Sequence, residues 1–143
     1  MFNPTRDQVR SFFFETWRKY RGGEPLAGLE TTALGVLLLH PEYHGILEDP
    51  SRHAAREWTP EEGTLNPFLH LSMHLAIEEQ RSIDQPPGIA ALLAALAARH
   101  GDAHAAVHAA LECLGESLWR AGQSGGGPDA EAYLDCLRRA ASR

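Results

Sequence analysis

The sequence predicts an all-α protein, an antiparallel helical bundle of five to seven helices with a four-helix core. Apolar residues recur at helical spacing along most of the chain. Helix-start and helix-stop residues divide these runs into segments with short connections, as in a bundle. Segments with the alternation typical of strands are almost absent. A chain of 143 residues can bury its own core, so we expect a single helical-bundle, metal-binding domain over residues 1–143.

The first half of the chain contains two predicted helices and a break. Asn3 and Pro4 provide a start signal for the first helix, which two adjacent glycines end. A second helix begins after Pro25 and reaches Pro41. Proline lacks a backbone donor and clashes with the preceding turn, so we expect a kink or break near His40.

The second half begins with a polar stretch and continues as helices. The polar, aperiodic sequence of residues 51–59 predicts an ordered surface loop. The sequence Thr-Pro-Glu-Glu at residues 59–62 predicts a capping box on a short helix. Start and stop residues then delimit four further helices, over residues 66–82, 89–99, 102–122 and from 128 onward.

Composition excludes several classes of protein. The chain is 43% hydrophobic and 22% charged, as in a soluble globular protein. A net charge of −6 argues against nucleic-acid binding, and the longest apolar run is too short to cross a membrane. No secretory signal is visible. Because Cys113 and Cys136 form no CxxC motif, we expect a reduced, cytoplasmic protein in which Cys113 is a small buried hydrophobe.

One ligand-like spacing, His-x3-His-x3-Glu, occurs three times in the chain. At this composition, chance predicts far less than one such pattern. The flanking residues differ, so the repeated feature is the spacing and not a duplicated segment. Its members are His40, His44 and Glu48; His70, His74 and Glu78; and His104, His108 and Glu112.

This spacing suits metal binding, because residues four apart share one face of a helix. Two imidazoles on that face can converge on one ion, and a carboxylate one turn further can bridge to a second. Apolar residues separate the second and third pairs, so we expect the histidines to point inward, where they need a shared partner. The competing interpretation is hydrogen-bonded core histidines or a solvated polar face.

Not all nine side chains can bind one compact centre directly. Each pattern spans about 12 Å of helix, whereas paired metal ions lie about 3.5–4 Å apart. We therefore expect Glu48 and Glu112 either to accept hydrogen bonds from the ligand histidines or to serve as alternative metal ligands. The predicted direct metal ligands are His40, His44, His70, His74, Glu78, His104 and His108.

Four segments resemble a family of small bacterial proteins, found mostly in proteobacteria, that is known only as a domain of unknown function. The resemblance covers nearly the whole chain and implies no established activity. It is carried by Phe-Phe-Phe-Glu-Thr-Trp-Arg-Lys-Tyr at 12–20, His-Pro-Glu-Tyr-His at 40–44, the segment beginning Asn-Pro-Phe-Leu-His at 66–80, and Ser-Ile-Asp-Gln-Pro-Pro-Gly at 82–88.

The ligand spacing is also loosely similar to that of hemerythrin-like bundles, which hold two irons with His-x3-His and His-x3-Glu helix pairs. His104 with His108, and His74 with Glu78, match these elements. The additional His-x3-His pair and Pro41 depart from that pattern. Helical metalloproteins of the DinB-like type, with three histidines on one zinc or nickel ion, offer an alternative resemblance.

We predict a His/Glu-rich, dinuclear non-haem iron centre, because mixed His and Glu ligands favour iron over copper. Zinc, manganese and nickel are the alternatives. The expected partner is a small molecule such as oxygen or peroxide, for oxidase- or oxygenase-like chemistry, oxygen binding or redox sensing. Nucleic acid and membrane are not expected, and a homo-oligomer is left open. The alternatives are a mononuclear three-histidine zinc or nickel enzyme and a non-catalytic bundle with a structural metal site.

Overall fold

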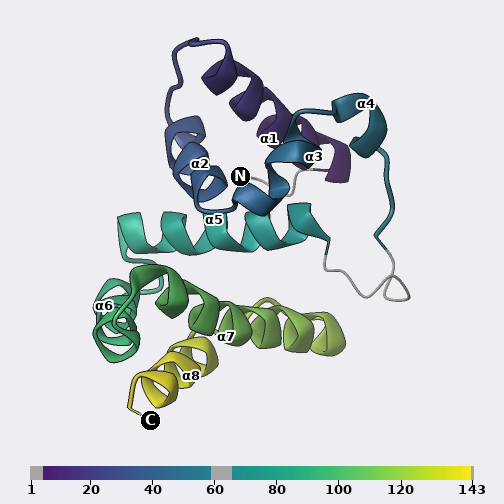
Figure 1. Cartoon of the computed structure of the whole chain (residues 1–143). Helices are drawn as coiled ribbons and strands as arrows, with labels where there is room; N and C mark the ends of the chain where they lie inside the picture. Colours follow the sequence, from purple (N-terminus) through teal and green to yellow (C-terminus); the bar gives the residue numbers. More distant parts are fainter. Residues whose placement is uncertain (1–4, 59–65, 143) are drawn as a thin grey trace. The chain divides into compact units, whose positions relative to one another are not determined.

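The computed structural model describes residues 5–58 and 66–142, and these residues form an all-α fold (Figure 1). No strand occurs in the described part of the chain, which confirms the predicted fold class. Two compact units, Met1–Leu75 and Ala76–Arg143, divide within the long helix α5 (Pro67–Ile83). Each unit has its own core, and the single-domain organisation stays a prediction. None of the described helices is both long and apolar enough to cross a membrane.

The first unit joins two long helices to a series of short ones and to the first half of α5. Its remaining elements are α1 (Arg6–Arg21), α2 (Leu29–Leu38), the 3-10 turn η1 (Pro41–Tyr43), α3 (His44–Leu47) and α4 (Pro50–His53). Thr5 begins α1 through a capping box, in which its hydroxyl accepts from the Gln8 N–H at 3.1 Å. The Asn3–Pro4 start signal lies outside the described residues.

Pro41 interrupts the chain after α2, as the sequence predicts. Helix α2 ends at Leu38, and the chain continues as η1 and then α3. His40 has backbone angles of φ −126° and ψ 64°, outside the helical region, because the ring of a following proline disfavours that region. His40 and His44 therefore do not lie on one continuous α-helix.

An apolar cluster from α1, α2, α3 and α5 forms the core of the first unit. Aromatic rings contribute much of it, with Phe14 5.3 Å from Phe68 between ring centroids. Burying one such side chain stabilises the fold by about 1.5–3 kcal/mol. The buried members are Phe13, Phe14, Trp17, Ala33, Val36, Leu37, Leu47, Phe68, Leu71 and Leu75.

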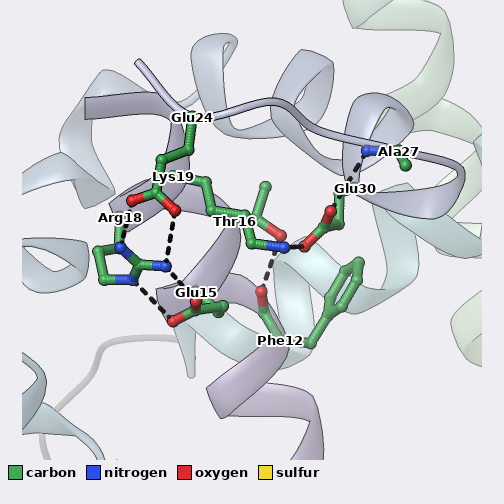
Figure 2. A network of polar contacts seen from close by, with 8 residues as sticks. All are labelled: Phe12, Glu15, Thr16, Arg18, Lys19, Glu24, Ala27 and Glu30. Atoms are coloured by element: carbon green, nitrogen blue, oxygen red, sulfur yellow. Dashed lines mark hydrogen bonds and ion pairs between the residues drawn. The ribbon is translucent and has the colours of Figure 1, made fainter. Parts of the chain in front are cut away.

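A polar network joins the end of α1 to the start of α2 (Figure 2). Lys19 Nζ lies 2.8 Å from Glu30 Oε2, and the other Glu30 oxygen accepts from the Ala27 N–H at 3.3 Å. These hydrogen bonds lower the pKa of the Glu30 carboxyl. Arg18 binds both Glu15 and Glu24, so its guanidinium already contacts two carboxylates. The network fixes the connection between the two helices.

Arg10 is buried on α1 and holds the segment that follows α4. Its Nη1 donates to the carbonyls of Ala54 at 3.0 Å and Arg56 at 2.8 Å. The guanidinium also lies 5.2 Å from the Trp58 ring and 5.0 Å from the Phe68 ring, within cation–π range. Burial lowers the pKa of Arg10. We call this arrangement the Arg10 clamp.

The expectation of an ordered surface loop at residues 51–59 agrees with residues 54–57, which are exposed and non-helical, but not with residues 51–53. Residues 50–53 form α4 instead, and His53 is only 7% exposed. Local composition could not indicate this, because the donor that satisfies these carbonyls lies more than forty residues earlier in the chain. The capping box predicted at 59–62 lies outside the described residues.

The second unit contains the rest of α5 together with α6 (Ile89–His100), α7 (Ala103–Ser124) and α8 (Ala130–Ser142). Helices α6, α7 and α8 pack against one another in pairs. Asp102 caps α7 by accepting from the Ala105 N–H at 2.9 Å, as its position in the sequence predicts. The preceding Gly101 ends α6 with φ +72°, a left-handed conformation that favours glycine.

Cys113 and Cys136 form a disulfide between α7 and α8, with their Cα atoms 5.8 Å apart. The expectation that Cys113 is a free, small hydrophobe is therefore wrong, although the residue is buried. The two cysteines are 23 residues apart in the sequence, and helix packing brings them together. No local sequence motif indicates this pairing. Disulfides persist mainly in oxidising compartments, so cysteine usage no longer supports a cytoplasmic location, which stays a prediction.

Replacing Arg10 by Met should lower the free energy of unfolding by about 2–4 kcal/mol, because it leaves buried carbonyls without a donor. Urea denaturation measures this change. Arg6→Met is the matched control, since Arg6 is an exposed residue of the same helix that pairs with Glu57. Equal midpoints for the two variants would show that the clamp is unimportant for stability.

The double variant Cys113→Ser/Cys136→Ser should lose about 2–4 kcal/mol of stability, because the disulfide no longer restricts the unfolded chain. Thermal unfolding with and without dithiothreitol measures the effect. Reductant should lower the melting temperature of the parent protein and leave that of the double variant unchanged. An unchanged melting temperature of the parent protein in reductant would contradict a stabilising role for this bond.

Candidate metal centre

Three imidazoles from the first unit meet beside the break at Pro41. His40 follows α2, and His70 and His74 lie on α5. One ring nitrogen of each histidine lies within 4.8 Å of one ring nitrogen of each of the others. The His40 ring centroid is 4.4 Å from that of His74 and 5.1 Å from that of His70. We call these three residues the histidine triad.

Helix α5 fixes the spacing of two triad members. Asn66 caps this helix, with its Oδ1 accepting from the Phe68 N–H at 2.9 Å. His70 and His74 then lie one turn apart on the same face, and their Nε2 atoms are 3.2 Å apart. Two nitrogens bound at about 2.0–2.1 Å to a tetrahedral ion would lie about 3.3 Å apart. The observed separation is that of a hydrogen bond between the two rings, and it also suits a shared ion.

A backbone hydrogen bond orients His40 in the triad. Its Nδ1 lies 2.8 Å from the Val36 carbonyl oxygen, and because a carbonyl only accepts, Nδ1 carries the proton. In this tautomer Nε2 is the ring nitrogen that can bind a metal ion. Metal-binding histidines commonly donate their second N–H to such a carbonyl. With an exposed fraction of 1%, His40 is shielded from water.

Tyr43 lies against the triad on η1. Its ring is nearly parallel to that of His40, with centroids 5.7 Å apart and an interplanar angle of 5°. It meets the His70 ring edge-on at 6.1 Å. Burial, followed by the nearby Glu42 carboxylate, raises the pKa of Tyr43. The phenol therefore stays neutral and contributes an aromatic face to the site.

The first predicted pattern is not assembled as the sequence suggests. His44 places its Nε2 2.8 Å from the Leu37 carbonyl and packs against Trp17, with ring centroids 4.3 Å apart. Glu48 pairs with Arg21, whose Nε lies 3.5 Å from Glu48 Oε1. Among the described residues, neither His44 nor Glu48 belongs to the triad group. The ligand spacing of this pattern requires a continuous helix, and the break that the sequence itself predicts at Pro41 removes that condition.

The other predicted ligands lie in the second unit. Glu78 pairs with Arg81 one turn further along α5, with Oε1 3.1 Å from Nη2. His104 and His108 share a face of α7, with ring centroids 4.3 Å apart. Glu112 is exposed on the same helix. The participation of these residues in one centre with the triad stays a prediction.

His53 is a buried imidazole that lies outside the repeated pattern. It stacks on Trp58, with ring centroids 6.2 Å apart and an interplanar angle of 22°. Its buried Nδ1 has no hydrogen-bond partner in the described part of the protein. Burial, aided by the positive charges of Arg56 and Arg52, lowers the pKa of His53. The sequence offers no periodic signal for this burial, which occurs beside Arg10, 3.5 Å from the His53 carbonyl oxygen.

Comparison with known proteins identifies one family. A sequence model of the family described as a domain of unknown function, DUF1841, matches residues 5–139. No curated protein and no solved structure matches the chain. The family match covers both units and carries no activity, so the function has to be inferred from the site itself.

Acid should destabilise the protein partly through His53. Its pKa is lower in the folded state than the unfolded value of about 6.5, so protons favour unfolding. The contribution of His53 is present above pH 6.5 and is lost as the pH falls below it. In chelator-treated protein, urea midpoints measured from pH 7.5 to 5 should fall less for His53→Gln than for the parent.

His100→Gln is the control for this measurement, because His100 is exposed at the end of α6. It should follow the pH profile of the parent protein. Identical slopes for His53→Gln and the parent would mean that His53 does not couple protonation to unfolding.

Proposed function

The chain belongs to the DUF1841 family, and we propose that its first unit binds a transition-metal ion through His40, His70 and His74. The convergence of three imidazole nitrogens is the observation that carries this proposal. Imidazole is a ligand that suits zinc, iron, nickel and copper. The hydrogen bond from His40 to the Val36 carbonyl supports it further, because it orients the ring and places a proton on Nδ1, so that Nε2 would be the nitrogen that binds the ion.

Three histidine ligands leave a coordination position for a small molecule. In zinc enzymes with three protein ligands, the ion activates a bound water and brings its pKa to about 7. The chain's own contribution would be to hold the ion on fixed rings, with Tyr43 and the core residues around it limiting access of solvent. The mononuclear three-histidine centre is therefore the function that this unit supports best.

A dinuclear iron centre for oxygen or peroxide chemistry is the second candidate. The repeated spacing favours it, and the paired rings of His104 and His108 on α7 would add two nitrogen donors. Such a centre also needs carboxylates, and the carboxylate of the first pattern, Glu48, pairs with Arg21. We infer that the number of ions bound per chain separates the two candidates.

Untagged protein should contain about one transition-metal ion per chain if the triad forms a mononuclear centre, and two if the centre is dinuclear. Mass spectrometry of the metal content, combined with an absorption spectrum, measures the stoichiometry and the identity of the ion. His74→Ala and His40→Ala should each reduce the bound metal strongly, because two imidazoles hold an ion poorly.

Two controls define the ligand set. His100→Ala should retain its metal, and His44→Ala should also retain it while losing stability, because His44 contacts Leu37 and Trp17. His108→Ala tests the second candidate, since loss of metal from this variant would bring α7 into the centre. Full metal content in His74→Ala would overturn the proposal, and circular dichroism should confirm that each variant is folded.

A further inference from the structure

A cavity of about 580 Å³ lies in the first unit between α1, α3 and α4. It is lined by buried side chains of the core and bordered by charged residues, and it contains no member of the histidine triad. Its volume is within the range of small-molecule sites, which are also mostly apolar with a few polar groups. We call it the α1–α4 pocket.

Rigid apolar side chains form the floor of this pocket. Phe14, Trp17 and Leu47 line it, and all three are buried members of the core. The Phe14 ring is held by Phe68, and the Trp17 indole is held by His44. A floor of fixed apolar side chains suits an apolar ligand body, because the burial of apolar area favours binding.

The border of the pocket offers one cation with unused hydrogen-bonding capacity. Arg18 already contacts the carboxylates of Glu15 and Glu24 (Figure 2). Arg21 makes a single contact, from Nε to Glu48 at 3.5 Å, and no second ion pair with any residue that the structure describes. A guanidinium presents five N–H donors in a planar fork that fits a carboxylate.

We propose that the α1–α4 pocket binds a small aromatic carboxylate. The ring of the ligand lies on the Phe14, Trp17 and Leu47 floor, and its carboxylate accepts from the guanidinium of Arg21. A bidentate contact of this kind gives direction as well as affinity. The proposal is independent of metal binding, because it uses none of the three triad histidines.

The test uses 2-naphthoate as the probe and isothermal titration of the full chain. We expect saturable binding with one site per chain. Ala54→Leu adds bulk to the pocket wall and should weaken binding about tenfold or more, which corresponds to about 1.4 kcal/mol. Ser11→Leu, on the exposed face of α1, is a second variant that fills the same pocket.

The charge contact is tested separately with Arg21→Gln. This variant should weaken 2-naphthoate binding about five- to tenfold and leave the binding of neutral 2-naphthalenemethanol unchanged. Arg52→Gln is the matched control, because Arg52 is exposed on α4 and does not line the pocket. It should bind both probes as the parent does.

Several results would overturn the proposal. These are the absence of saturable binding at millimolar probe, unchanged binding in both pocket-filling variants, or equal losses in Arg21→Gln and Arg52→Gln. Tighter binding of the neutral probe would reject the carboxylate class. Repeating the titration with chelator-treated protein separates the two proposals, since probe binding should persist whether or not the triad binds metal.

Discussion

The arrangement of the first unit depends on Pro41, which has no N–H to continue a helix and whose ring disfavours helical geometry in the residue before it. Proline stops α2 and holds His40 outside helical geometry, so that its ring can donate to Val36 and face α5. Without this break, a continued helix would stack His44 one turn beyond His40 on the same face. Instead, the chain turns and His44 packs on Trp17. A single backbone constraint thus separates two identical residues into a site member and a core contact.

The sequence predicted the features that depend on local geometry. Asn66 and Asp102 begin helices where their capping side chains indicate, and His70 and His74 meet because α5 is continuous. It could not predict the features set by contacts between distant segments. The buried His53 lies beside Arg10 of α1, which contacts its carbonyl, and the Cys113–Cys136 bond joins α7 to α8.

Trp17 joins the two sites of the first unit through ordinary core packing. Trp17 lines the α1–α4 pocket, and its indole also packs at a tilt against His44, the residue that follows η1. Tyr43, at the end of η1, contacts His40. Interiors pack densely, so a ligand that shifted this indole would press on the residues beside the triad. The link between the pocket and the triad therefore runs through neighbouring side chains.

Through the Arg10 clamp, the structure of α4 and of the residues that follow it depends on a side chain of α1. Helices of four residues, such as α3 and α4, have no appreciable stability in isolation, because nucleating a helix is unfavourable. The carbonyls that follow α4 obtain their donors from a side chain on α1, which acts as a C-cap supplied by a different helix. Pro50 and Ala54 line one side of the α1–α4 pocket, so the shape of that side depends on a guanidinium that is remote in the sequence.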